Sequence, residues 1–226
     1  MAKELEIMDY SPTWKTEYEF EARAIKRVLG KNCIAIHHIG GTSFGEIKSK
    51  PIIDLMAIVS DMNLIDSLYD ELRAIGYNCK DGEDSRDSRI FVKMMGNPHY
   101  NLHIYSADNK REIERRVAVR EYFLKNPDSA KEYEALKVKL AEKYGCDSAE
   151  YQKGKEEFLQ LVEKHALNKK DKQDRLSFGM AVGMMIGLVL GFSIGVSIDN
   201  LVNGLCYGLG IGLVLGLTIS SFDRSK

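Results

Sequence analysis

Glycine recurs at every fourth position near the C-terminal end of this 226-residue chain. The series runs through Gly179, Gly183, Gly187, Gly191 and Gly195, and it resumes at Gly204, Gly208, Gly212 and Gly216. A spacing of four keeps the glycines on one stripe of a helix, and a stripe without side chains lets two helix backbones approach closely. The pattern therefore predicts two helices that pack through glycine.

The same region is almost free of charge. Between Phe178 and Phe222 the only charged residue is Asp199, although 29% of the whole chain is charged. Residues 178–198 and 201–221 each have about the 20 residues that cross a hydrocarbon core of roughly 30 Å. We therefore predict a transmembrane hairpin at 178–221, with membrane lipid as a partner. A second copy of the chain, bound through the glycine stripe, is a further possible partner.

Basic residues flank this hairpin and predict its orientation. They are Lys169, Lys170, Lys172 and Arg175 before the first span, and Arg224 and Lys226 after the second. Because positive charge is retained on the cytoplasmic side, the pattern predicts a multi-pass membrane protein with the N-terminal domain and the C-terminus in the cytoplasm. The domain boundaries follow as a soluble domain at 1–168, a basic polar linker at 169–177 and a tail at 222–226.

The soluble domain has the pattern of a mixed α/β fold. Short apolar runs predict strands, and spaced apolar residues predict helices. The expected order is a helix at 12–29, strands at 33–38 and 51–59, a helix at 64–75, strands at 89–95 and 100–105, and helices from 108 to 165. The fold class is thus α/β (α+β), a mixed sheet flanked by helices, with two C-terminal transmembrane helices. A net charge of −1 gives no reason to expect nucleic acid as a partner.

A glycine turn follows the first predicted strand. Gly40, Gly41, Thr42 and Ser43 lie between that strand and a short helical segment, an arrangement that suits phosphate. Lys50 adds a positive charge close by in the sequence. The alternative is an ordinary turn in which Thr42 or Ser43 serves as a helix cap.

A single carboxylate interrupts the second predicted strand. Asp54 lies in an apolar run, where a charge is costly unless it is paired or meets a metal ion or solvent. His38 and His103 also interrupt apolar strands, and with Asp54 they could hold a divalent cation, either Mg²⁺ or Mn²⁺, with Zn²⁺ as an alternative. The alternative for each histidine is a hydrogen-bonded core residue.

Several segments together resemble the GrpB-like family, a branch of the nucleotidyltransferase superfamily with a DNA polymerase β-like fold. They are residues 10–14 (YSPTW), 38–43 (HIGGTS), 50–54 (KPIID), 101–104 (NLHI) and 120–137. The resemblance implies a nucleotidyltransferase-like sheet that holds an NTP and a metal ion. It places phosphate at Gly40, Gly41 and Thr42, metal at Asp54, and a further phosphate contact at Arg120.

The sequence departs from the superfamily at the expected carboxylates. Met56 stands where a second aspartate is usual, and the strand of the third offers His103. The first functional hypothesis is metal-dependent transfer of a nucleoside monophosphate from an NTP to an unknown small-molecule or protein acceptor, with Asp54 and His103 as catalytic residues. The alternative is a degenerate nucleotide or phosphate binding module, assembled at the membrane by the hairpin. A third hypothesis is a purely structural interaction protein.

Overall fold

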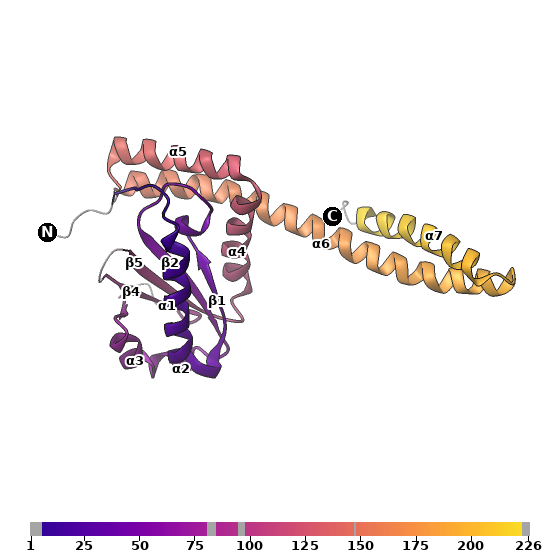
Figure 1. Cartoon of the computed structure of the whole chain (residues 1–226), viewed down its shortest axis with the longest axis horizontal. Helices are drawn as coiled ribbons and strands as arrows, with labels where there is room; N and C mark the ends of the chain where they lie inside the picture. Colours follow the sequence, from indigo (N-terminus) through magenta and orange to yellow (C-terminus); the bar gives the residue numbers. More distant parts are fainter. Residues whose placement is uncertain (1–5, 81–84, 95–97, 147, 223–226) are drawn as a thin grey trace. The chain divides into compact units, whose positions relative to one another are not determined.

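The computed structural model describes residues 6–80, 85–94, 98–146 and 148–222. The chain forms two compact units, Met1–Lys164 and His165–Lys226. The first unit contains the elements α1 (Thr13–Leu29), β1 (Cys33–Ile39), β2 (Ile52–Val59), α2 (Asn63–Asp66), α3 (Tyr69–Ala74), β3 (Asn78–Cys79), β4 (Ser88–Lys93), β5 (His99–Ser106), α4 (Lys110–Lys125), α5 (Pro127–Tyr144) and the beginning of α6 (Ala149–Ser197) (Figure 1). These elements confirm the predicted mixed α/β fold class.

Five strands form one mixed sheet in the order β1-β2-β5-β4-β3. The central pair, β2 and β5, is parallel, and the other neighbours are antiparallel. The four strands predicted from apolar runs are present, with small shifts at their ends, and residue 95 lies outside the described residues. The prediction missed β3, because two residues are too few to give a periodic signal.

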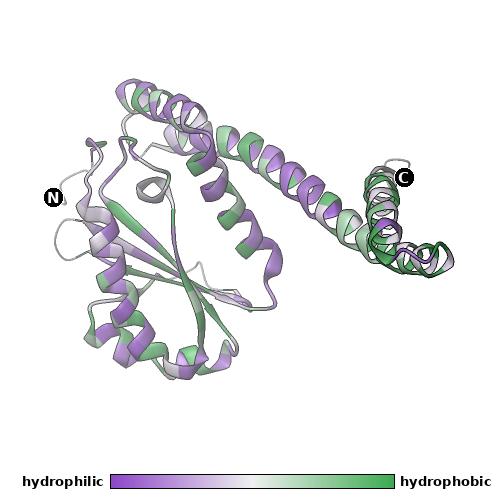
Figure 2. Ribbon diagram, turned by 45° about the vertical axis from the view of Figure 1, so that its right-hand side comes forward, coloured by the Kyte–Doolittle hydropathy of each residue, from purple (hydrophilic) through white to green (hydrophobic). Residues whose placement is uncertain are grey.

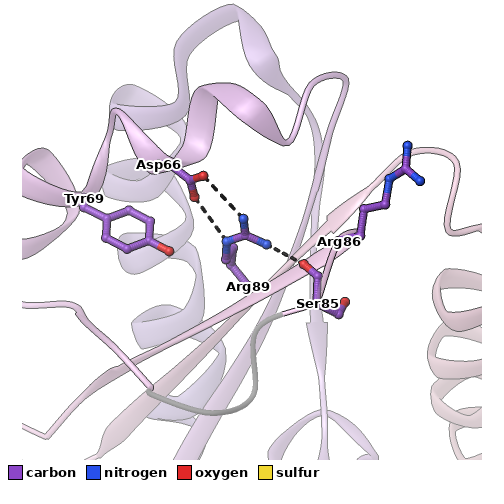
Figure 3. Close-up of a pocket in the computed structure, with 5 residues that line it drawn as sticks. All are labelled: Asp66, Tyr69, Ser85, Arg86 and Arg89. Carbon is purple, nitrogen blue, oxygen red and sulfur yellow. Dashed lines mark hydrogen bonds and ion pairs between the residues drawn. The ribbon is translucent and has the colours of Figure 1, made fainter.

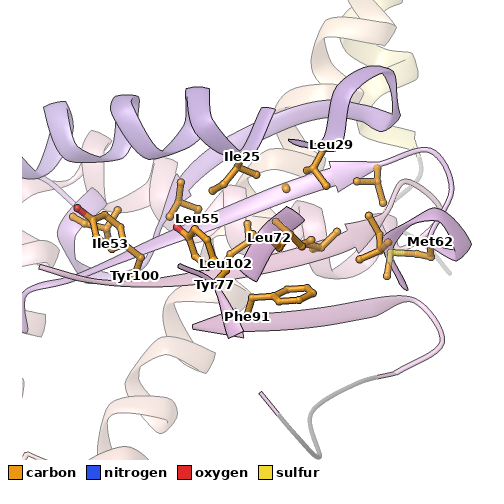
Figure 4. Close-up of a cluster of buried hydrophobic side chains, with 14 of the residues drawn as sticks. Ile25, Leu29, Ile53, Leu55, Met62, Leu72, Tyr77, Phe91, Tyr100 and Leu102 are labelled. Carbon is orange, nitrogen blue, oxygen red and sulfur yellow. The ribbon is translucent and has the colours of Figure 1, made fainter. Parts of the chain in front are cut away.

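The larger hydrophobic core lies on one face of the sheet. Alternation along β2 directs Ile53 and Leu55 to this face, where Leu102 of β5 joins them. Ile25 and Leu29 of α1 cover the same face, and both are buried (Figure 4). Burial of each such side chain contributes roughly 1.5–3 kcal/mol of transfer free energy, so this face supplies most of the stability of the sheet.

The opposite face has a smaller apolar cluster and carries the predicted carboxylate. Ile39, Met56 and Tyr105 are buried there, with Ile113 and Val117 of α4 packed against them. Since Asp54 precedes Met56 by two residues on β2, its side chain belongs to this face as well. The fold thus places Asp54 under α4 and away from the main core.

Two local predictions differ from the structure. The helix predicted at 64–75 is interrupted: α2 ends at Asp66 and α3 begins at Tyr69, with the Ser67 hydroxyl donating to the Leu64 carbonyl at 2.7 Å. The pair Asn126-Pro127 predicts that Asn126 caps α5, but its side chain instead donates to the Tyr122 carbonyl at 2.6 Å and closes the end of α4. A polar side chain between two helices can bond in either direction, and the sequence alone does not choose.

The second unit is a helical hairpin. The last part of α6 and α7 (Leu201–Phe222) are joined at Asp199, which has a positive φ of 54°. The glycines of the two helices face each other, because a Cβ on Gly183 would lie 2.2 Å from the Gly212 carbonyl oxygen, and one on Gly187 would lie 2.3 Å from that of Gly208. The glycines of the two helices therefore face each other within one chain, and a homo-oligomer through the stripe stays a prediction.

The hairpin is apolar over most of its surface. Figure 2 shows hydrophobic colouring along both helices, and Val189, Val202 and Val214 are among the exposed side chains. Both α6 and the segment Leu201–Thr218 contain a window that is long and apolar enough to cross a membrane. Residues 169–177, predicted as a linker, are helical and belong to α6.

Candidate functional site

The Gly40 turn packs directly on the carboxylate of Asp54. Gly40 has a φ of 73° and a ψ of −176°, a combination that essentially only glycine adopts. A Cβ on this residue would lie 2.0 Å from Asp54 Oδ2. The structure therefore brings the predicted turn and the predicted carboxylate into contact, and it does so through a position that excludes any side chain.

The hydroxyl groups of the turn form internal hydrogen bonds. Thr42 Oγ1 donates to the Ile52 carbonyl at 3.0 Å and also lies 3.0 Å from His38 Nε2. Ser43 Oγ donates to the Gly40 carbonyl at 2.7 Å. These two hydroxyls, predicted to contact phosphate, thus fix the shape of the turn.

Asp54 shares its face of the sheet with Asn101 and His103. The parallel register pairs Asp54 with Asn101 and Met56 with His103, which directs all four side chains to one side. Asn101 Nδ2 donates to Asp54 Oδ1 at 2.8 Å. The side chain of Asp54 is 22% exposed, and loss of hydration raises its pKa, although the Asn101 hydrogen bond and the charges of Lys155 and Arg116 oppose this rise.

His103 is close to Asp54 but does not form an ion pair with it at neutral pH. His103 Nε2 lies 3.9 Å from Asp54 Oδ1. Burial, together with the charges of Arg116 and Lys80, lowers the pKa of His103 to about 3, so the ring is neutral. Its Nδ1 is buried and has no hydrogen-bond partner among the described residues.

The structure does not bring His38 to this group. Antiparallel pairing places Ile39 opposite Asp54, so His38 points to the other face, where it stacks on Tyr18 of α1 with ring centroids 4.7 Å apart. The predicted metal set of Asp54, His38 and His103 is therefore not assembled. His38 has the alternative role stated for it, a hydrogen-bonded residue of the core.

Three lysines surround the turn and the carboxylate. Lys50 Nζ donates to the Cys146 carbonyl at 2.8 Å, and its charge lies near that of Lys155. Lys137 is buried, and its Nζ donates to the Lys48 carbonyl at 2.6 Å and to Ser49 Oγ at 2.8 Å. A Cβ on Gly41 would lie 3.6 Å from that same Nζ. Lys137 of α5 thus lies beside the turn, Lys155 of α6 lies near Asp54, and Lys50 lies near Lys155.

Burial lowers the pKa of two of these lysines. The pKa of Lys137 falls to about 8, and that of Lys155 falls by the same cause, although the charge of Asp54 opposes the fall. Carboxylates oppose both shifts, because the charge of Glu134 acts on Lys137 and the charges of Asp54 and Glu156 act on Lys155. No periodic pattern predicts either lysine as a site residue, because both lie on charged helices that are far from the turn in the sequence.

Three arginines of α4 have different surroundings. Arg115 is bound by carboxylates, with its Nε 2.9 Å from Glu163 and its Nη1 3.2 Å from Glu112. The charge of Arg116 acts on Asp54 and His103, and its Nε is buried without a hydrogen-bond partner among the described residues. Arg120, the predicted phosphate ligand, instead acts on Tyr18, His37 and His38. Arg116 is therefore the arginine whose charge reaches the carboxylate.

The donor set around Asp54 does not fit the predicted divalent metal centre. No group of three or more His, Cys, Asp or Glu side chains in the described ranges is arranged to hold a metal ion. One oxygen of Asp54 accepts a hydrogen bond from Asn101, and the other lies against Gly40. The charges of Lys155 and Arg116 act on the same carboxylate, and such cations also oppose metal binding.

A cavity of about 190 Å³ opens beside the turn. Its wall includes Ile39, Gly40 and Phe44 from the turn region, Arg115, Arg116 and Val119 from α4, and Glu156, Leu159 and Glu163 from α6. Because Gly40 contacts Asp54 and also lines this cavity, the cavity and the lysine-rich surroundings of the turn are neighbours.

A larger pocket, of about 510 Å³, lies near the beginning of β4 and includes none of the predicted site residues. Arg89 crosses it and donates to Asp66 Oδ1 at 3.1 Å, while Arg86 extends away from this pair (Figure 3). Arg89 also donates to the carbonyl groups of Ser85 and Ser88. The pocket is thus crossed by a structural ion pair, and the chemistry of the turn is elsewhere.

These features define the class of protein: a mixed α/β domain in which a glycine turn packs on a strand that carries an aspartate. Residues 4–165 match the family model described as GrpB protein. The chain belongs to the GrpB family.

Similar proteins agree with this assignment. UPF0157 protein YqkA of Bacillus subtilis is 33% identical over 165 residues, which are 73% of this chain and 48% of YqkA, so the chain spans about half the length of that relative. The crystal structure of the conserved protein GrpB from Enterococcus faecalis is 35% identical, with a TM-score of 0.68, and the match covers 73% of this chain and 99% of that one. A structure of Cid1 with the UTP analog UMPNPP is 16% identical, with a TM-score of 0.46 and coverage of 66% and 48%; likeness at this level does not identify a function.

Asp54→Asn is expected to stabilise the first unit at pH 7. The pKa of Asp54 is higher in the folded protein than in the unfolded chain. The folded state is therefore most stable below the unfolded pKa, and it loses that stability as the pH rises through the folded pKa and Asp54 ionises. An amide removes that cost and can still accept from Asn101, so urea denaturation in a chelating buffer should show a gain of about 1 kcal/mol. The gain should shrink below about pH 4, where aspartate is protonated in both states. A loss of stability at pH 7 would show instead that the charge of Asp54 stabilises the fold.

Proposed function

We propose that the first unit binds a nucleotide by its phosphate groups at the Gly40 turn. The observation that carries this proposal is the position of Lys137 beside Gly41 and of Lys155 near Asp54, the carboxylate on which Gly40 packs. Lysine ammonium groups bind phosphate as point charges, and partial burial strengthens such contacts. Two of the turn residues, Gly40 and Gly41, have no side chain to shield the backbone N–H groups that a phosphate would meet.

Asp54 has a defined role in this proposal. Its negative charge lies beside Lys155 when no ligand is bound, and it offsets part of the cost of burying that cation. A bound phosphate replaces this partner with a stronger one. Asn101, which holds Asp54 Oδ1, fixes the carboxylate in position.

Nucleotidyl transfer is the second candidate. The observation that favours it is the closeness of Asp54 to His103, a neutral ring whose Nδ1 has no partner among the described residues. The predicted metal does not fit the donor set, so we derive no transfer step through a metal ion. Formation of a nucleotidylated product in the binding assay below would favour transfer over binding alone.

We also propose that the hairpin anchors the chain in a membrane with both ends in the cytoplasm. Its support is the exposed apolar surface, since Val202 is 72% exposed and Val189 is 68% exposed. In water such a surface would cost about 25 cal/mol for each Å². Lipid is the environment in which helices of this length and composition are stable.

Lys155→Met is expected to weaken phosphate binding by the full chain in detergent. Loss of one charged hydrogen bond to phosphate should lower the affinity for ATP and for inorganic tripolyphosphate at least about tenfold. Isothermal titration calorimetry measures both affinities, and a product assay follows the same samples. Lys153→Met is the matched control, because Lys153 is exposed on the same helix. Equal affinities in the two variants, or no binding by the wild-type chain, would contradict the proposal.

A further inference from the structure

The cavity beside Gly40 combines apolar walls with a polar rim. Phe44, Val119 and Leu159 supply the apolar surface. The Phe44 ring is held against Phe123 and Tyr133, with ring centroids 4.6 Å and 6.1 Å away. A rigid aromatic wall of this kind suits a flat ligand, because stacking requires a surface that does not move.

The rim of the cavity is fixed by one arginine. Arg115 reaches Glu163 at 2.9 Å and Glu156 at 3.8 Å, so α4 and α6 are joined across the opening. Arg115, Glu156 and Glu163 thus add guanidinium donors and carboxylate acceptors to the lining of the cavity. A ligand that fits it must carry both donors and acceptors along one edge.

The cavity and the lysines lie on adjacent stripes of α6. Glu156, Leu159 and Glu163 follow a spacing of three and four residues, so they share one stripe, which lines the cavity. Lys155 precedes Glu156 by one residue and therefore lies on the neighbouring stripe, toward Asp54. A ligand that extends along the Gly40 turn can thus meet the lysines at one end and the cavity at the other.

We infer that this cavity holds the base of the nucleotide whose phosphates bind at the turn, an inference that rests on the proposed function. A nucleobase has two apolar faces and an edge that carries hydrogen-bond donors and acceptors. The cavity volume of about 190 Å³ is below the roughly 300–1,000 Å³ of sites that enclose a whole drug-sized ligand. It therefore accommodates a ring system and leaves the phosphate groups outside, beside the lysines.

The test compares nucleoside triphosphates with inorganic tripolyphosphate, which has the charges but no base. Isothermal titration of the full chain in detergent should give an affinity at least tenfold higher for one or more of ATP, GTP, CTP and UTP. Leu159→Trp fills the cavity from α6 and should reduce the nucleotide affinity to that of tripolyphosphate, while tripolyphosphate binds as before. Val119→Trp fills it from α4 and should do the same.

Leu161→Trp is the matched control, because Leu161 is 61% exposed on the same helix and should leave both affinities unchanged. If wild-type protein binds tripolyphosphate as tightly as every nucleotide, or if the two cavity variants leave nucleotide affinity unchanged, the base does not occupy this cavity. Those results would leave phosphate binding intact. If neither ligand binds, the proposed function itself fails, and the inference fails with it.

Discussion

Gly40→Ala should destabilise the first unit by about 3 kcal/mol, a large share of the stability of a typical domain. One part of the cost is the backbone, because alanine is strained at a φ of 73° and a ψ of −176°. The other part is steric, since the new Cβ would lie 2.0 Å from Asp54 Oδ2 and 2.8 Å from its Cγ. Urea denaturation of the full chain in detergent, followed by tryptophan fluorescence of the buried Trp14, measures the loss.

Two further variants separate these parts. Gly45 also has a positive φ, of 100°, but a Cβ there would meet nothing within 4 Å, so Gly45→Ala should cost only about 1 kcal/mol. In an Asp54→Ala background, Gly40→Ala should cost less than in the wild type, because the carboxylate that it meets is gone. Equal costs in the two backgrounds would show that the turn and the carboxylate are not in contact.

Gly183→Val should separate the two helices of the hairpin. Its Cβ would lie 2.2 Å from the Gly212 carbonyl oxygen and 2.5 Å from the Gly216 backbone, which cannot yield as a flexible side chain can. We expect a loss of about 2 kcal/mol or more in hairpin stability, because overpacking against backbone displaces a whole helix. Energy transfer between dyes at residues 180 and 217, measured in lipid vesicles, should decrease accordingly.

Gly210→Val is the control for this experiment. A Cβ on Gly210 would meet nothing within 4 Å, so the same change should leave energy transfer as in the wild type. In both variants the chain should remain in the membrane pellet after an alkaline wash, because apolar length is retained. A loss of transfer in Gly210→Val as large as in Gly183→Val would mean that valine acts through the helix itself and not through packing.

Much of the sheet could be predicted because its signals are local. The apolar runs at 33–38 and 51–59 match β1 and β2 closely, and Gly30 ends α1 with a positive φ of 55°. The alternation in β2 was enough to separate Asp54 from Ile53 and Leu55. Local signals do not contain the order of the strands in the sheet. The position of β5 next to β2 therefore could not be predicted from the sequence.

The candidate site was predicted only in part, for the same reason. Asp54 and the Gly40 turn are close in sequence, and the structure brings them together. His38 was grouped with them, but the register of β1 directs it to the face of α1. Asn101 could have been found from its position two residues before His103 on one face of a strand. Lys137 and Lys155 could not, because helix packing alone brings them to the turn.

The candidate site is built from segments that are far apart in the sequence, and this affects when it can form during synthesis. Asp54 and Asn101 meet when β5 joins β2, but Lys155 arrives only with α6, about one hundred residues after Asp54. A nascent chain that stopped before Ala149 would contain the whole sheet and still lack one of the cations that surround the carboxylate. The site proposed at the turn is therefore completed late in synthesis, shortly before the first long apolar stretch of α6 emerges from the ribosome.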